Sequence, residues 1–365
     1  MGGFECSTHR DNRGRRLDLI ASTRHDEFAE ADYSRLLDHN IKTCRDGVRW
    51  HLIEPEPFRY DFSSLEKQIR AAQKTGIEIV WDYFHYGYPN DLDIFTDHFI
   101  ERFASFSRVV TQYLRGELGR SLFVCPVNEI SFFSWVAGHV GVFYPCAKRR
   151  GGVLKRQLVR SALASINAIR SVAPNAKMMF TDPAIHVVSR SKSAATRRAA
   201  ENYRLSQYEA FDMLMGRKQP DLGGTPDAVD IIGLNYYFHN QWHFPNRRKI
   251  HRDHEIYRPL SDILREFYFR YHKPMVIAET GIEDDERPDW FRYVCEQTTL
   301  ARSAGIDVNG VCLYPIVNHP GWADDRHCYN GLWDYADDSG GREIYEPLAA
   351  EIAYQHNLLS KSAAG

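Results

Sequence analysis

Two glutamates stand directly after apolar segments, where a charged side chain needs a physical reason to be present. Glu129 follows the segment Val124-Cys125-Pro126-Val127-Asn128, and Glu279 follows Met275-Val276-Ile277-Ala278. An ionised carboxylate that is buried without a partner loses its hydration at a large cost in free energy. Each glutamate is therefore expected to pair with a cation, to be protonated or to line a wet cleft. For either one alone, a buried ion pair with arginine is the simpler interpretation.

The elements that must position these glutamates are short strands that alternate with longer amphipathic stretches. This alternation is typical of βα units around a parallel sheet. We expect eight strands, at Gly3–Ser7, Gly47–Leu52, Ile77–Phe84, Leu122–Val127, Lys177–Thr181, Ala228–Leu234, Pro274–Ala278 and Val308–Tyr314. The helix after the second strand is expected to begin near Asp61–Glu66 and to end at Gly76. Eight such units predict an α/β protein with a (β/α)8 TIM barrel.

A single barrel domain is expected over residues 1–358, followed by a flexible C-terminal tail at 359–365. In such barrels the chemistry sits at the C-terminal ends of the strands. Glu129 and Glu279 end the fourth and the seventh predicted strand, on opposite sides of the barrel mouth. Two facing carboxylates can flank one scissile bond, which is the arrangement that glycoside hydrolysis requires: an acid of raised pKa and an ionised partner.

Several short motifs resemble glycoside hydrolase family 1, and more broadly its clan of retaining barrel glycosidases. Asn128-Glu129 is similar to the acid/base motif of the family, and Glu279-Thr280-Gly281 is similar to its nucleophile motif. The family motif of strand six is similar to Gly233-Leu234-Asn235-Tyr236-Tyr237. Its sugar-binding turn after strand three is similar to Trp81–Pro89, and the end of its strand two is similar to Arg49-Trp50. The resemblance covers most of the barrel.

The resemblance implies a retaining β-glycoside hydrolase that acts on a β-linked glycoside or oligosaccharide by double displacement. Glu279 would attack the anomeric carbon, and Glu129 would act as general acid and then as general base. Tyr237 would donate a hydrogen bond to Glu279 and keep it ionised. Arg49 would lie beneath Glu279 as a fixed positive charge. No cofactor is required by this mechanism.

Further residues would contact the carbohydrate substrate. The resemblance implies that Asn128 binds the 2-hydroxyl of the sugar and that His85 binds another hydroxyl. Asn235, Tyr314 and Trp322 are expected in the same substrate-binding set. A strand-end cap is the alternative role for Asn128, and a purely structural histidine is the alternative for His85.

Departures from the family pattern affect the sugar contacts. His9 stands where the family has glutamine, Tyr314 ends strand eight where tryptophan is usual, and Gly321 precedes Trp322 where glutamate is usual. A preference for glucose or galactose is therefore not implied. The nearby Asp324, Asp325, His319 and His327 would rebuild a polar wall; their spacing matches no metal-ligand motif, so no metal is expected.

Composition disfavours other classes of partner. A net charge of −2 provides no global field that would recruit nucleic acid or an anionic membrane. The basic runs Lys148–Arg150 and Arg247–Lys249 are interpreted as solvated surface segments. Seven scattered cysteines without metal-ligand spacing favour reduced thiols and a cytoplasmic location, and no signal peptide or membrane-spanning run is expected.

Two alternatives keep the same barrel. A catalytically inactive carbohydrate-binding barrel would retain the cleft, although the presence of both glutamates disfavours it. A transglycosidase would share every catalytic residue, because it differs only in whether water or a sugar hydroxyl completes the second step.

Overall fold

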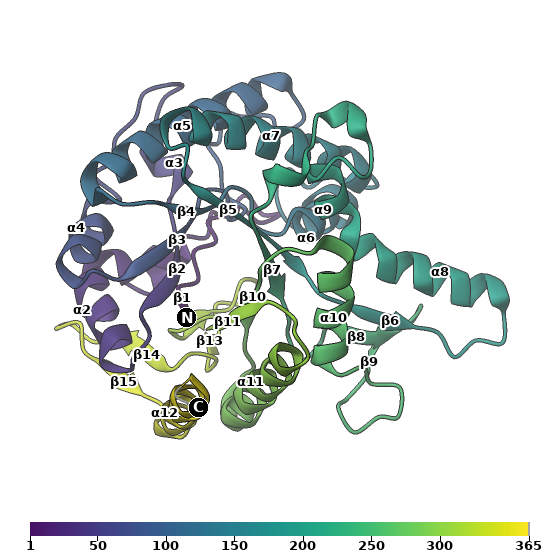
Figure 1. The fold of residues 1–365 in the computed structure, drawn as a ribbon. Helices are drawn as coiled ribbons and strands as arrows, with labels where there is room; N and C mark the ends of the chain where they lie inside the picture. Colours follow the sequence, from purple (N-terminus) through teal and green to yellow (C-terminus); the bar gives the residue numbers. More distant parts are fainter. Residues whose placement is uncertain (364–365) are drawn as a thin grey trace.

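Eight parallel strands close into a barrel in the computed structural model, which describes residues 1–363 (Figure 1). Each barrel strand pairs with its neighbours in the chain, and the first strand closes the sheet against the last. The strands are β1 (Gly2–Gly3), β2 (Thr43–Gly47), β3 (Glu78–Asp82), β4 (Phe123–Cys125), β5 (Lys177–Pro183), β7 (Ile231–Asn235), β10 (Met275–Thr280) and β11 (Val308–Leu313). The predicted (β/α)8 barrel is confirmed.

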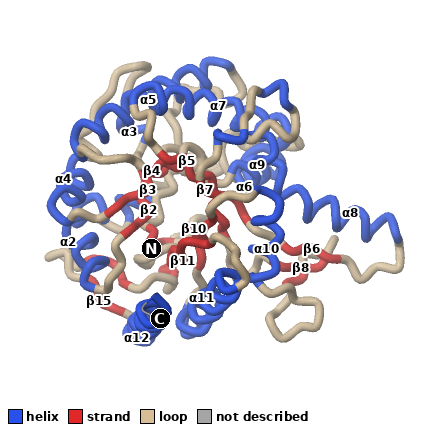
Figure 2. Tube along the Cα trace, in the orientation of Figure 1, coloured by secondary structure: helices blue, strands red, loops and turns tan. Residues whose placement is uncertain are grey.

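Helices cover the outer face of this barrel, as Figure 2 shows. They are α2 (His25–Asp38), α4 (Glu66–Thr75), α5 (Asp97–Leu118), α7 (Gly151–Val172), α9 (Glu209–Leu214), α10 (Leu260–Tyr271), α11 (Arg287–Ser303) and α12 (Glu346–Ala363). Helix α4 ends at Gly76 as predicted, because a left-handed residue with φ of 72° closes its last turn. Helix α12 extends into the segment that was expected to be a tail, and residues 364 and 365 lie outside the described residues.

The second strand lies earlier in the chain than predicted. Strand β2 spans Thr43–Gly47, and the short helix α3 (Trp50–Ile53) takes up the second half of the predicted strand Gly47–Leu52. The true strand was missed because it contains Arg45 and Asp46, two charged residues that are fully buried. A search for apolar runs selects the Val48–Leu52 segment instead.

Side chains alternate between the two faces of the sheet. Ile79, Trp81 and Val124 belong to the large core between barrel and helices, whereas Val80 and Cys125 belong to a small cluster that the barrel strands form separately. The barrel is therefore a packed core and not a channel. No helix within residues 1–363 is both long and apolar enough to cross a membrane.

A smaller unit projects from the barrel on one side (Figure 1). It consists of helix α8 (Ala194–Leu205) and a three-stranded sheet with β6 (His186–Val188), β8 (Gln241–His243) and β9 (Arg248–Lys249). The chain enters this unit after β5 and again after β7. We call residues 186–205 and 241–258 the arm.

A buried polar network holds helix α2 against the barrel. His25 contacts Asp32 through Nδ1 at 2.8 Å and Asp46 through Nε2 at 2.9 Å, and both carboxylates are buried. Arg342, on strand β15 (Arg342–Ile344), binds Asp32 with Nε at 2.7 Å. Burial disfavours a charged imidazole, but the two aspartates outweigh it and raise the pKa of His25 to about 9.

This network predicts that stability falls at alkaline pH. Because the folded-state pKa of His25 lies above the ordinary value of 6.5, its contribution is complete below pH 6.5 and is lost as pH rises through about 9. We expect the free energy of unfolding to fall by about 3 kcal/mol across this window. Urea denaturation from pH 6 to pH 9 and the NMR titration of His25 would measure it. The control variant His98→Gln changes an exposed histidine and should show the same fall as the native protein. A titration midpoint of His25 near pH 6.5 would contradict the prediction.

Candidate active site

A cavity of about 1150 Å³ opens at the C-terminal ends of the barrel strands. Side chains at or just after the ends of several different strands line it, which is where barrel enzymes carry their chemistry. They include Glu5, His85, Glu129, Tyr237, Glu279 and Tyr314. The two glutamates that the sequence singled out therefore share one cavity.

Glu279, in strand β10, is held by one donor from strand β2 and one from the loop after strand β7. Arg45 donates from Nη1 to Oε1 at 2.9 Å, and the Tyr237 hydroxyl donates to Oε2 at 2.9 Å. The Tyr237 contact is the one expected from the sequence. Burial raises the pKa of Glu279, while the charges of Arg45 and His85 oppose that rise. A cation at hydrogen-bond distance favours the ionised form of this carboxylate.

The arginine beneath Glu279 is Arg45 and not Arg49, so this prediction was wrong. Arg49 lies after strand β2, where Nη1 binds Asp26 at 2.7 Å and Asp18 at 3.3 Å. It does not line the cavity. The error follows from the shifted second strand: the inward-facing arginine lies within the true strand, and Arg49 stands at the start of the helix that follows.

Glu129 occupies a strained backbone position at the end of strand β4. Its φ of 49° and ψ of 60° place it in the left-handed region, and it precedes helix α6 (Ile130–Trp135). A non-glycine residue in this region costs roughly 1–3 kcal/mol and persists only where the surroundings hold it. Here Asn235 donates from Nδ2 to Oε1 at 2.8 Å, and the Tyr86 hydroxyl donates to Oε2. The strain directs the carboxyl group into the cavity.

The two carboxyl groups differ in charge environment. Glu129 has neutral hydrogen-bond donors, and burial together with the negative charge of Glu279 raises its pKa to about 8. Glu279 has Arg45 as a partner. The surroundings thus favour the protonated form at Glu129 and provide a positive charge only for Glu279, and a general acid and its partner require such a difference.

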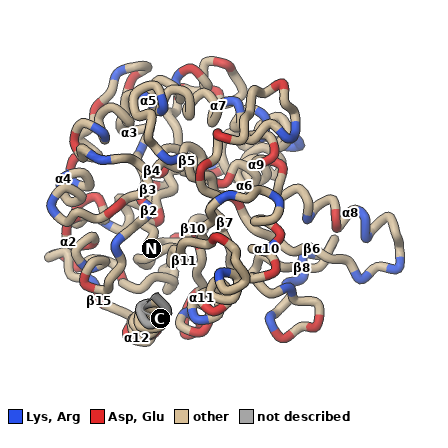
Figure 3. The backbone as a smooth tube through the Cα atoms, viewed as in Figure 1, with Lys and Arg blue, Asp and Glu red and all other residues tan. Residues whose placement is uncertain are grey.

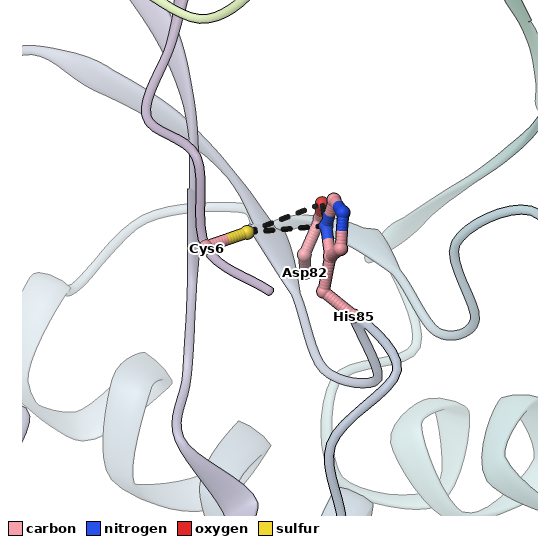
Figure 4. A group of neighbouring side chains, drawn as sticks. All are labelled: Cys6, Asp82 and His85. Atoms are coloured by element: carbon pink, nitrogen blue, oxygen red, sulfur yellow. Dashed lines mark hydrogen bonds and ion pairs between the residues drawn. The ribbon is translucent and has the colours of Figure 1, made fainter. Parts of the chain in front are cut away.

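A second buried group lies beside Arg45 (Figure 4). The His85 Nδ1 contacts Asp82 Oδ2 at 3.0 Å and the Cys6 sulfur at 3.2 Å, and Cys6, Asp82 and His85 could together surround a metal ion. However, Asp82 is already bound by Arg45 Nη2 at 2.5 Å, and burial followed by the charge of Asp82 raises the pKa of the Cys6 thiol well above its ordinary value. A protonated thiol next to a guanidinium is a poor cation site. The three residues are best described as a hydrogen-bonded group that orients His85.

The asparagines of the motifs contact the carboxylate network and do not line the cavity. Asn128 accepts from Arg45 at 3.0 Å through Oδ1, and its Nδ2 lies 3.1 Å from His85 Nε2. Asn235 donates to Glu129 as described. Both side chains are fully buried, so their position is consistent with holding the reactive groups in place.

Three of the predicted sugar contacts line the cavity, whereas His9, like the two asparagines, does not. His85, Tyr314 and Trp322 line it. The Tyr314 ring packs directly on Gly3, where a Cβ atom would come within 2.1 Å of it. His9 is covered by the Phe143 ring, stacked at 3.8 Å, and is absent from the cavity wall, and its contact with sugar stays a prediction.

The polar wall after strand eight forms only in part. His319 and Asp324 line the cavity. Asp325 instead pairs with Arg15, and His327 pairs with Asp334 at 2.7 Å.

Besides Arg45, sequence reasoning missed two residues of the site, Glu5 and Tyr86. Glu5 is a third buried carboxylate in the cavity wall, and its Oε1 accepts from the Ser7 amide at 2.9 Å. It follows strand β1 (Gly2–Gly3) but lies inside the predicted strand Gly3–Ser7, so the strand-end argument used for the other two glutamates passed over it. Tyr86, in contrast, is one of several aromatic residues in the Trp81–Pro89 segment, and no sequence signal distinguishes it.

No family model and no curated protein sequence matches this chain. Solved structures match it over most of its length. The family 1 β-glucosidase from Thermotoga maritima has a TM-score of 0.79 at 16% identity, covering 92% of this chain and 87% of that one. A hyperthermophilic β-glucosidase mutant has a TM-score of 0.77 at 14% identity, covering 96% and 98%. The fold is shared with family 1 β-glucosidases.

The Thermotoga maritima enzyme has also been solved in complex with glucoimidazole and with deoxynojirimycin, at TM-scores of 0.78 and 0.79 and 16% identity. At this identity the likeness establishes the barrel architecture. The assignment of roles to individual residues depends on the geometry of this chain.

The coupling between the two carboxyl groups predicts how Glu129 titrates. Removing the negative charge of Glu279 by Glu279→Gln should lower the pKa of Glu129 by roughly one to two pH units, because that charge is a cause of the raised value. Infrared difference spectroscopy across the titration would measure it. Glu283→Gln, which removes a different carboxylate from the cavity wall, should leave the midpoint in place, and an unchanged midpoint in Glu279→Gln would contradict the coupling.

Proposed function

We propose that the protein is a retaining β-glycoside hydrolase that cleaves a β-linked glycoside or oligosaccharide by double displacement. The observation that supports this most directly is the pair Glu129 and Glu279, which share one cavity but have opposite charge environments. The shared fold with β-glucosidases supports it further. A β-glucosidase-like or β-galactosidase-like activity is the specific form of the proposal.

In the first step, an oxygen of Glu279 forms a bond to the anomeric carbon while the bond to the leaving oxygen breaks. The proton held by Glu129 passes to that oxygen. Glu279 is suited to attack because Arg45 and Tyr237 keep it ionised and oriented. Glu129 is suited to donate because its pKa of about 8 keeps it protonated at neutral pH.

In the second step, Glu129 has become ionised and removes a proton from an incoming water. The water oxygen bonds to the anomeric carbon, and the bond to Glu279 breaks. The sugar leaves with its original anomeric configuration, because two inversions have occurred. Glu129 regains its proton and the cycle closes.

Trapping of the covalent intermediate tests this proposal. We expect 2-deoxy-2-fluoro β-glycosides with an activated leaving group to add one glycosyl unit to Glu279, because the fluorine slows both steps and the leaving group accelerates only the first. Intact-protein and peptide mass spectrometry would locate the adduct, and NMR of the product would show the anomer. Gluco and galacto forms should both be tried. An inverted product, or an adduct on another residue, would contradict the mechanism.

The two arginines provide a matched test of which cation supports the nucleophile. Arg45→Met should reduce kcat by roughly 100-fold or more, and it should move the acidic limb of the pH profile upward, because the charge of Arg45 lowers the pKa of Glu279. Arg49→Met, which removes the same group from outside the cavity, should retain kcat within about threefold. Equal losses in both variants, with no movement of the acidic limb, would indicate that Arg45 acts only through stability.

A further inference from the structure

One of the two basic runs that the sequence analysis assigned to solvated surface lies at the cavity. Arg247 and Lys249 line the cavity, whereas the other run, Lys148–Arg150, is absent from its wall, and the Arg150 guanidinium lies over the Phe95 ring. The Arg247 guanidinium lies 5.0 Å from the centre of the Trp135 ring on helix α6. The arm thus brings two positive charges to one side of the cavity.

This side is where the leaving group would lie. Glu129 is the proposed proton donor to the leaving oxygen, so the departing part of the substrate extends from Glu129 along the elements that follow it. Phe132 and Trp135 on helix α6, together with Trp242 on strand β8, line the cavity there. Aromatic rings of this kind form platforms for sugar rings or other flat groups.

The basic residues on this side have no acidic partners. Arg247, Arg248 and Lys249 form no ion pair with any residue from 1 to 363; the cationic groups of Arg247 and Lys249 lie over the rings of Trp135 and Phe238. Elsewhere in the cavity wall the positive charges are neutralised, since Lys155 pairs with Glu209 and Arg326 with Glu283. The unpaired charges are available to a ligand.

The positive charge continues along the arm, as the Lys and Arg positions in Figure 3 show. Residues 186–205 and 241–258 contain ten Lys and Arg but only three Asp and Glu, in a chain whose net charge is −2. The inner part of the cavity has the opposite character, because Glu5, Glu129 and Glu279 lie there with few cations. An uncharged sugar suits the inner part, and negative charge is favoured only farther out.

We propose that the leaving-group side binds an anionic aglycone, namely a glycan chain that carries carboxylate or sulfate groups, whose uncharged terminal sugar enters the inner cavity. This inference rests on the proposed function and adds the substrate class. A nucleic acid is less suited, because the catalytic carboxylates at the cavity floor would repel its phosphates. The glycan is also favoured by the aromatic residues that lie between the catalytic pair and the basic residues.

A pair of substrates that differ in one charge tests the proposal. Both substrates carry the sugar that the trapping experiment shows to be accepted. One has 4-hydroxy-3-nitrobenzoic acid as its β-linked aglycone, and the other has the methyl ester of that acid. In the double variant Arg247→Gln/Lys249→Gln, the ratio of kcat/KM for the acid to that for the ester should fall about three- to tenfold. The control double variant Lys67→Gln/Arg302→Gln loses two exposed charges on helices α4 and α11 and should keep the ratio of the native protein.

Binding provides a readout that does not depend on turnover. Fluorescently labelled oligosaccharides of β-1,4-linked glucuronic acid and of β-1,4-linked glucose differ only in the carboxylate. We expect the acidic chain to bind more tightly, to weaken as NaCl is added, and to weaken in the Arg247→Gln/Lys249→Gln variant. Equal binding of both chains, or no loss in that variant, would overturn the proposal. Tighter binding of a single-stranded oligodeoxynucleotide that is lost in the same variant would overturn it in favour of a nucleic-acid surface.

The two proposals can fail separately. Hydrolysis of both aryl glycosides with an unchanged acid-to-ester ratio in the double variant would reject the anionic aglycone and leave the hydrolase intact. Absence of hydrolysis and of any adduct, together with selective and salt-dependent binding of the acidic chain, would reject the hydrolase and retain the anion-binding side.

Discussion

The buried guanidinium of Arg45 is the interaction on which the rest of the site depends. It lies fully buried inside the barrel and donates to Asp82, Asn128, Glu279 and the backbone carbonyl of Ala278. A buried charge is costly unless opposite charges and hydrogen-bond acceptors surround it, and the loss of one partner leaves the others uncompensated. Arg45 thereby connects strands β2, β3 and β10 with the end of β4, and the positions of the partners on those elements are set by one cation.

The same guanidinium makes the two catalytic candidates different. Glu279 contacts it directly, whereas Glu129 is held only by the neutral donors Tyr86 and Asn235. Two side chains of the same type thus have different charge environments. The backbone strain at Glu129 belongs to the same arrangement, because the hydrogen bonds around it stabilise a conformation that the residue alone would not adopt.

The cavity is organised by charge along its length. Carboxylates dominate its inner part, and unpaired arginine and lysine side chains lie at the outer side next to aromatic rings. The outer side is built by the arm and by the first residues of helix α7, neither of which belongs to the barrel sheet. The barrel therefore provides the buried carboxylates, while elements outside the sheet determine what lies next to them. This division is common in barrel enzymes, since loops can vary without disturbing the sheet.

The sequence by itself determined the barrel and the two glutamates that share its cavity. Alternation of apolar strands and amphipathic helices is a local signal, and a carboxylate after an apolar run is a local anomaly, so both can be recognised without knowing any contact. Only the tertiary structure decided the partners. Arg45 and Glu279 are 234 residues apart, and a strand that buries charge does not look apolar, so Arg49 was chosen in its place. The covering of His9 by Phe143 and the placing of Arg247 over Trp135 likewise depend on how distant segments pack, which composition and spacing do not contain.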